Sequence, residues 1–147
     1  MYLSLREGVL HLFGEELSCR TTRDYAHYAF DLRGKIAEVA AASPWHKALV
    51  LPNSWQPDGS LMALLTFREG CLYSVAMLAL HKEARLEEME GYHDYVHRLT
   101  NHGQSAKRFA WGRVFLQQGP PVEQEWFIVE FEAEEPAECA EAPSVAQ

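Results

Sequence analysis

The sequence predicts an α+β protein, built on an antiparallel sheet of about six or seven strands with two helices packed on one face. Three observations carry this prediction: apolar runs flank glycine turns, two segments have helical apolar spacing, and a late segment alternates apolar with acidic residues. The predicted order is ββα-β-ββα-ββ, and strand pairs with intervening helices are typical of the α+β class. A chain of 147 residues is of a size for one domain.

Two predicted hairpins are closed by the same tripeptide, Arg-Glu-Gly. Glycine adopts positive φ at low cost, so a short turn ending in glycine favours a hairpin with a bulge. We expect residues 2–5 to pair with 9–13, and residues 61–67 to pair with 71–80. A helix is predicted after each hairpin, so the two ββα units either descend from a duplication or match by chance.

The first predicted helix starts at a threonine cap and runs to Ser43 before Pro44. Thr21 or Thr22 can cap it, with Asp24 in the first turn near the positive end of the helix dipole. Gly34 inside it costs about 1 kcal/mol relative to alanine. The predicted buried stripe has i, i+3, i+4, i+7 spacing and comprises Tyr25, Tyr28, Ala29, Leu32, Ile36, Val39 and Ala40.

The second predicted helix covers residues 82–101 and ends at a glycine cap, Gly103. Its apolar face comprises Leu86, Met89, Tyr92, Val96 and Leu99. Its solvated face comprises Glu83, Glu87, Glu88 and Glu90. Such a division of apolar and charged residues predicts that one face packs on the sheet.

Residues 47–51 form a predicted short buried strand, and a long hairpin of 107–117 with 122–133 follows near the carboxyl end. In the second strand of this hairpin one face is apolar and the other acidic, the alternation of a half-buried antiparallel strand. The apolar face comprises Phe127, Val129, Phe131 and Ala133, and the other Ile128, Glu130, Glu132 and Glu134. We expect residues 1–133 to be a single α+β domain and 134–147 an acidic, disordered tail.

In this hairpin a four-residue loop places Lys107 opposite Glu132 and Phe109 opposite Glu130. A shift of one residue places Arg108 opposite Glu132 instead. Either pairing brings opposite charges together across the strands.

The net charge lies entirely at the carboxyl end. Residues 1–122 carry thirteen acidic and thirteen basic side chains, whereas residues 123–147 carry eight glutamates and no lysine or arginine, which accounts for the net charge of −8. Such an asymmetry indicates a basic partner or a role in solubility alone. Direct nucleic-acid binding is disfavoured, because phosphate binding needs clustered basic side chains. The one small basic and aromatic cluster, at residues 107–113, is interpreted as an ion-paired scaffold.

The three cysteines, Cys19, Cys71 and Cys139, are odd in number and widely spaced. This pattern favours free thiols in a reducing compartment, so a cytoplasmic location is expected. The first residues lack a basic stretch followed by an apolar one, so a signal peptide is not predicted. No apolar run approaches the length that spans a bilayer, so we expect no membrane association.

A metal site is conceivable on the second helix. His93 and His97 are four residues apart and so would share a helix face, and Asp94 follows the first histidine as glutamate does in His-Glu-x-x-His zinc sites. Asp is one methylene shorter than Glu, and both histidines border the apolar stripe. The alternatives are therefore a zinc site and ordinary boundary histidines, with no cofactor expected in the second case.

Trp55 lies in a loop framed by proline and glycine, where a tryptophan either anchors an interface or covers a sheet edge. The sequence favours a small acidic cytoplasmic protein that binds and inhibits or modulates a basic protein partner, as an immunity protein does, without catalysis of its own. The predicted contact comprises Trp55, Glu130, Glu132 and Glu134. The alternatives are a metal-dependent hydrolase using His93 and His97, and a homodimeric structural or adaptor protein.

Overall fold

The computed structural model describes residues 1–53, 55, 58–79, 94–100, 106–119 and 124–132. A three-stranded sheet comprises β1 (Tyr2–Ser4), β2 (Val9–Leu12) and β3 (Glu15–Leu17), followed by α1 (Arg23–Asp31). A seven-stranded sheet comprises β4 (Gly34–Val39), β5 (Trp45–Pro52), β6 (Leu61–Arg68), β7 (Cys71–Ala79), β8 (Lys107–Phe109), β9 (Gly112–Gly119) and β10 (Gln124–Phe131). A short helix covers residues 94–99.

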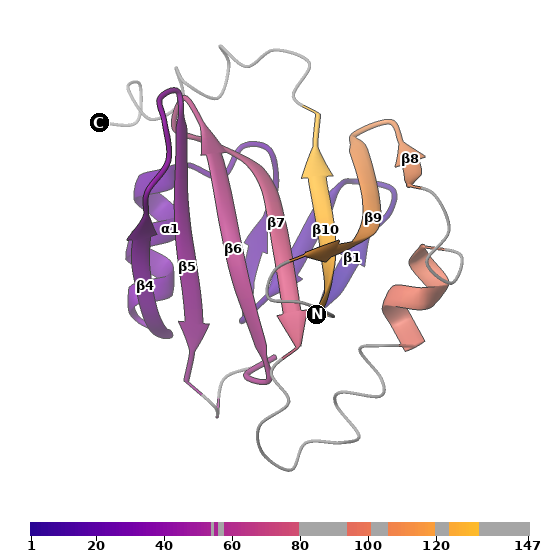
Figure 1. Cartoon of the computed structure of the whole chain (residues 1–147), viewed down its shortest axis with the longest axis horizontal. Coiled ribbons are helices and arrows are strands. Elements are labelled where there is room, and N and C mark those ends of the chain that lie inside the picture. Colours follow the sequence, from indigo (N-terminus) through magenta and orange to yellow (C-terminus); the bar gives the residue numbers. More distant parts are fainter. Residues whose placement is uncertain (54, 56–57, 80–93, 101–105, 120–123, 133–147) are drawn as a thin grey trace.

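The seven-stranded sheet has the order β4-β5-β6-β7-β10-β9-β8, and the paired strands are antiparallel. Figure 1 shows the three-stranded sheet and α1 on the same side of the large sheet, behind it in this view. The opposite face, called the outer face below, carries none of the labelled elements. The predicted α+β class with an antiparallel sheet and two helices is confirmed.

The core lies between the large sheet and the elements behind it. Alternate residues of the central strands, such as Val75, Met77, Phe127 and Val129, are fully buried on that side. The three-stranded sheet, α1 and the helix over 94–99 supply the opposing side chains, including Leu10, Phe13, Phe30, Val96 and Leu99. Both sheets therefore share one hydrophobic core, and the burial of this apolar surface favours their association.

Both predicted hairpins are confirmed, but Arg-Glu-Gly closes them differently. In the first, Ser4 pairs with Val9, so four residues form the loop. In the second, Arg68 pairs with Cys71, and Glu69 and Gly70 form a two-residue turn with φ of 53° and 85°. Positive φ at both turn positions matches the right-handed twist of the strands. The expected irregularity is present as a register shift between Thr66 and Phe67.

The first predicted helix is wrong beyond its second turn. Thr22 caps it, with its side chain accepting from the amide of Tyr25 as expected, but α1 ends at Asp31 and residues 34–39 form β4. The buried residues of α1 are Ala26, Ala29 and Phe30, whereas Tyr25, Tyr28 and Leu32 are exposed. β4 pairs with β5 along its whole length, and this tertiary pairing overrides helical spacing. The predicted strand over 47–51 is confirmed as part of the longer β5.

The carboxyl hairpin is confirmed, but its first strand is interrupted. Residues 110–111 separate β8 from β9, so β8 folds beside β9 as an edge strand. Glu130 faces Arg113 across β9 and β10, so the predicted pairing of Phe109 with Glu130 is wrong. The apolar alternation of β10 holds, because Phe127, Val129 and Phe131 are all buried.

The expectation of three free thiols is wrong for Cys71. Cys19 is free, whereas Cys71 is disulfide-bonded to a partner outside the described residues. No described helix is long and apolar enough to cross a membrane. The greater part of the second predicted helix and the predicted tail over 134–147 lie outside the described residues, so the domain division stays a prediction.

Candidate protein-binding surface

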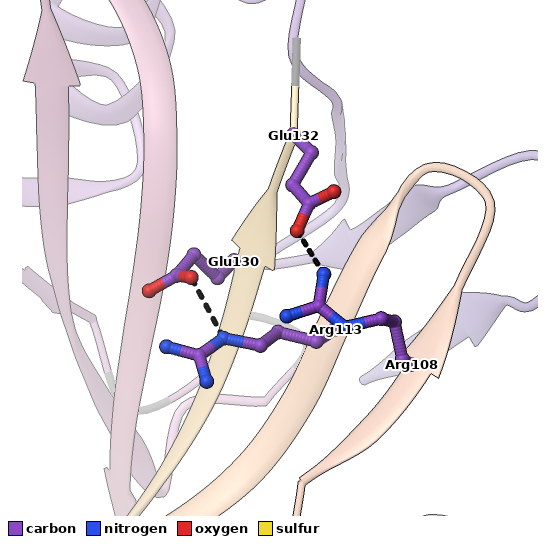
Figure 2. Close-up of polar contacts among 4 residues, drawn as sticks. All are labelled: Arg108, Arg113, Glu130 and Glu132. Carbon is purple, nitrogen blue, oxygen red and sulfur yellow. Dashed lines mark hydrogen bonds and ion pairs between the residues drawn. The ribbon is translucent and has the colours of Figure 1, made fainter.

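The two described glutamates of the predicted acidic face lie in ion pairs with arginines from the neighbouring strands. The Nε of Arg113, on β9, donates to Oε1 of Glu130 over 2.8 Å. Arg108, on β8, pairs with Glu132. Figure 2 shows both arginines pointing towards β10 from the same side. The expectation that opposite charges meet here is confirmed.

The outer face around these pairs is close to neutral. Strand pairing places Lys47, Thr66, Ser74, Glu130 and Arg113 in one row across five strands. Its cations offset the described glutamates, so this face presents little net negative charge. Glu134 lies outside the described residues. The role of Glu130, Glu132 and Glu134 in partner binding stays a prediction.

Trp55 is 71% exposed and follows the end of β5 in the chain. Lys47 shares the row of Glu130, and β5 continues for five more residues before it ends at Pro52. At about 3.3 Å per strand residue, the end of β5 lies about 16 Å along the sheet from that row, and Trp55 follows three residues later. A contact shared by Trp55 and the strand glutamates stays a prediction.

The basic and aromatic cluster serves the fold, as expected. The indole of Trp111 donates to the carbonyl oxygen of Leu5 over 2.7 Å and stacks on Phe109 with ring centroids 5.3 Å apart. Gly8 packs against the same indole, where a Cβ would approach a ring carbon to 2.4 Å. These contacts join the three-stranded sheet to the carboxyl strands.

The metal hypothesis gains no support from the described residues. His97 lies with its Nε2 3.9 Å from Oε1 of Glu125, while His93 is outside the described part of the chain. Within the described ranges no group of three or more potential ligands is close enough to hold a metal ion. The zinc site stays a prediction.

The exposed side of α1 gathers aromatic and acidic side chains. Tyr28 and Leu32 are 69% and 67% exposed, and Tyr25 is half-exposed. Asp24 and Asp31 are exposed on the same helix. At 100° per residue these five residues occupy one continuous arc of the helix, opposite Ala26, Ala29 and Phe30. We call this set Asp24, Tyr25, Tyr28, Asp31 and Leu32 the α1 face.

Sequence reasoning recognised this stripe of apolar residues but assigned it to the core. The signal against that assignment was available, because Asp24 and Asp31 lie within four residues of Tyr28 and share its side of the helix. An aromatic stripe bordered by carboxylates is typical of a surface. The small residues Ala26 and Ala29 fit closer to the sheet.

A polar network at the protein surface holds one side of the α1 face in place. The hydroxyl of Tyr25 donates to Oε1 of Glu15 over 2.7 Å, and the Nε of Arg33 donates to Oε2 over 2.9 Å. The hydrogen bond to the Glu15 carboxylate, followed by desolvation, raises the pKa of Tyr25 above its usual value of 10.0. The position of the Tyr25 ring is thus fixed by its hydrogen bond to Glu15 and not by burial in the hydrophobic core.

The two aspartates have no ion pair among the residues that the structure describes. Asp24 lies in the first turn, where the helix dipole favours an anion. Asp31 is the last residue of α1, where the dipole disfavours an anion, and the last turn has no basic residue. The negative charge of Asp31 is unfavourable at this end of α1, and no described residue offsets it. Such a charge indicates a role in binding and not in stability.

Comparison with known proteins adds little to this geometry. No protein-family model matches the chain, and no curated protein sequence matches it. One chain of a solved structure described as "Rhs1-CT in complex with cognate immunity protein RhsI1" is similar, with a TM-score of 0.47 and 14% sequence identity. The similarity covers 98% of this chain and 96% of that chain. At this level of similarity, function has to be argued from the surfaces of the chain itself.

Proposed function

We propose that this chain is a protein-binding module that occupies the basic surface of a protein partner, and inhibits or modulates it, without catalysis of its own. The observation that carries the proposal is the α1 face, in which two tyrosines and a leucine lie exposed between two aspartates that have no ion pair with any described residue. The charge distribution favours a basic partner, and the α1 face is a surface that suits one. This contact lies on α1, whereas the sequence predicted it on the strand with Glu130 and Glu132.

The chemistry of the α1 face suits a protein interface. Tyrosine buries a large ring at small entropic cost and keeps a hydroxyl for hydrogen bonding, so it is enriched among the residues that dominate binding energy. Asp24 and Asp31 border the aromatic centre, and a polar rim around an apolar centre is typical of interfaces. With a net charge of −8, the chain attracts a basic partner and accelerates encounter.

The proposal is tested by capture from the native cell followed by binding kinetics. A partner retained by the wild type is purified, and its association with D24N/D31N and Y28A variants is measured at increasing salt. We expect Y28A to speed dissociation by about tenfold or more, as for a central aromatic anchor. The D24N/D31N variant should lower the association rate and its salt dependence, because rim charges act mainly on encounter.

The E130Q/E132Q variant is the matched control, because it removes two charges from the strand predicted to bind. Unchanged binding by this control, with loss in the α1 variants, supports the proposal. Loss in the control alone would place the contact on β10 instead. Association that is independent of salt would argue against a basic partner altogether.

The homodimeric adaptor remains a second candidate, because the outer face carries an apolar row. Strand pairing aligns Leu49, Leu64, Ala76, Ile128 and Phe115 across five strands. All five are only half-buried. Light scattering of the purified chain decides between a monomer and a dimer, and a substitution in this row then tests whether the face joins the two copies.

A further inference from the structure

A pocket of about 400 Å³ opens on the outer face at one end of the large sheet. It is lined by Ala40, Ala41 and Ala42, which connect β4 to β5, and by side chains of β5, β6 and β7. Those side chains are Trp45, Lys47, Thr66, Tyr73 and Ser74. Its volume is in the range of small-molecule sites. It lies on the outer face, and so is separate from the α1 face behind the sheet.

Local backbone features hold the walls of the pocket in place. The amide of Trp45 donates to the carbonyl oxygen of Ala42 over 2.9 Å, and the amide of Glu69 donates to that of Pro44 over 3.1 Å. These bonds fix the connection from β4 to β5 against the turn between β6 and β7. The register shift leaves Tyr73 without a partner on β6, and a bulge of this kind redirects a side chain.

The walls are aromatic. The rings of Trp45 and Tyr73 meet edge to face, with centroids 5.1 Å apart. Arg68 lies over the Trp45 ring, with its Cζ 5.9 Å from the centroid. Together with the three alanines, the two rings provide an apolar enclosure for a planar or apolar group.

The floor is polar and its side chains are available. Lys47, Thr66 and Ser74 stand directly opposite one another on three adjacent strands. None of the three side chains has a hydrogen bond or ion pair within the described part of the chain. An ammonium and two hydroxyls are thus presented in one row to any group that enters the pocket.

The local charge is positive. Lys47 and Arg68 lie at the pocket, and the carboxylate of Glu130 beside Ser74 is bonded to Arg113. Desolvation, the charge of Glu130 and a hydrogen bond with the Glu130 side chain raise the pKa of Tyr73 above 10.0, so its hydroxyl stays protonated and neutral. Among the described residues, the two cations outnumber the one carboxylate, which is already paired with Arg113, and the ammonium and hydroxyls of the floor favour an anionic ligand.

We propose that this pocket binds a small aromatic carboxylic acid, with its ring packed against the joined rings of Trp45 and Tyr73 and its carboxylate on Lys47, Thr66 and Ser74. The same chemistry occurs in a free aromatic acid and in a polypeptide that ends in phenylalanine. The pocket would then serve either a small-molecule ligand or the chain end of another protein.

The test follows the indole N–H signal of Trp45 in nitrogen-labelled protein by NMR, during titration with N-acetylphenylalanine. N-acetylphenylalaninamide, which lacks the charge, is the control ligand. We expect a saturable shift with the acid, and at least about tenfold weaker binding of the amide, because a hydrogen bond to a charged group accounts for a factor of that size. A Gly-Gly-Phe peptide is titrated in parallel; binding of either acid supports the pocket, and the tighter one identifies the source.

Two variants test whether the carboxylate of the ligand binds to Lys47 and Thr66. K47Q removes the ammonium and T66V removes one hydroxyl without a change of shape, and each should weaken binding of the acid, K47Q by about tenfold. K35Q, an exposed lysine of β4, is the matched control and should leave binding unchanged. Equal binding of acid and amide, equal effects of K47Q and K35Q, or no saturable shift of Trp45 would each overturn the proposal.

Discussion

At the scale of single residues, one hydroxyl group joins two distant parts of the chain. β1 is an edge strand, and the backbone of Leu3 turns one donor and one acceptor away from β2. The hydroxyl of Tyr95 accepts from the Leu3 amide over 3.0 Å and donates to its carbonyl oxygen over 3.2 Å. An unpaired edge is a site for unwanted strand pairing, and Tyr95 covers this one.

Replacement of Tyr95 by phenylalanine should therefore destabilise the protein. The ring stays, but the buried amide of Leu3 loses its partner, which costs about 1–3 kcal/mol in the free energy of unfolding. Denaturant unfolding measures this loss. Y2F is the control, because Tyr2 is more than half exposed, and it should change the free energy by less than about 0.5 kcal/mol. Equal stability of Y95F and wild type would contradict the assigned role of the hydroxyl.

At the scale of elements, residues 34–39 show how two patterns compete. Ile36 and Val39 fit the helical spacing that starts in α1, yet both are β-branched and suit a strand equally well. β5 offers six successive pairing positions from Gly34 to Val39. Pairing with β5 provides hydrogen-bond partners for the backbone groups of this edge strand that face β5, so the strand is formed.

Gly34→Ala distinguishes a helix from a strand over residues 34–39 by the sign of its effect on the free energy of unfolding. In a helix this change would stabilise the protein by about 1 kcal/mol. In the strand, a Cβ would lie 2.3 Å from the carbonyl oxygen of Leu51, so we expect destabilisation by about 1–3 kcal/mol, as for an overpacked site. Thermal or denaturant unfolding gives the sign directly. G70A is the control: its Cβ meets nothing within 4 Å, so only the strain of φ +85° remains.

At the scale of the whole molecule, the described residues form three surfaces that suit binding. The α1 face is acidic and aromatic, the pocket is cationic and aromatic, and the rest of the outer face is apolar at its centre. The α1 face lies behind the large sheet, whereas the pocket and the apolar row are neighbours on the outer face, and each surface has residues of its own that substitutions can target. The outer face is the one that a second copy of the chain could cover, because its apolar row continues across five strands.

If two copies pair through the outer face, L64K should give a monomer, because a lysine in the centre of the row would be buried without a partner. L32K, on the α1 face, should leave the dimer intact while it weakens partner binding. Light scattering over a range of concentrations measures both. A wild type that stays monomeric throughout would exclude the homodimeric adaptor.

Short-range patterns made much of the fold predictable. Glycine turns between apolar runs identified two hairpins, the cap at Thr22 located the start of α1, and the alternation of β10 identified its buried face. Each of these signals is complete within a few residues, because turn conformation, capping and alternation depend on the local backbone. The sequence likewise identified Glu130 and Glu132 as one charged side of a strand.

Only the tertiary structure decided which surfaces remained available. It turned the Tyr25 and Tyr28 stripe outward, because Ala26 and Ala29 allow α1 to approach the sheet more closely. It paired Glu130 and Glu132 with arginines of two different strands, and it gathered Trp45, Lys47 and Tyr73 around one pocket. The charges and patterns of the chain by themselves determined an acidic α+β protein with paired strands. Where those charges and aromatic rings are exposed depended on contacts between distant segments, which local patterns do not encode.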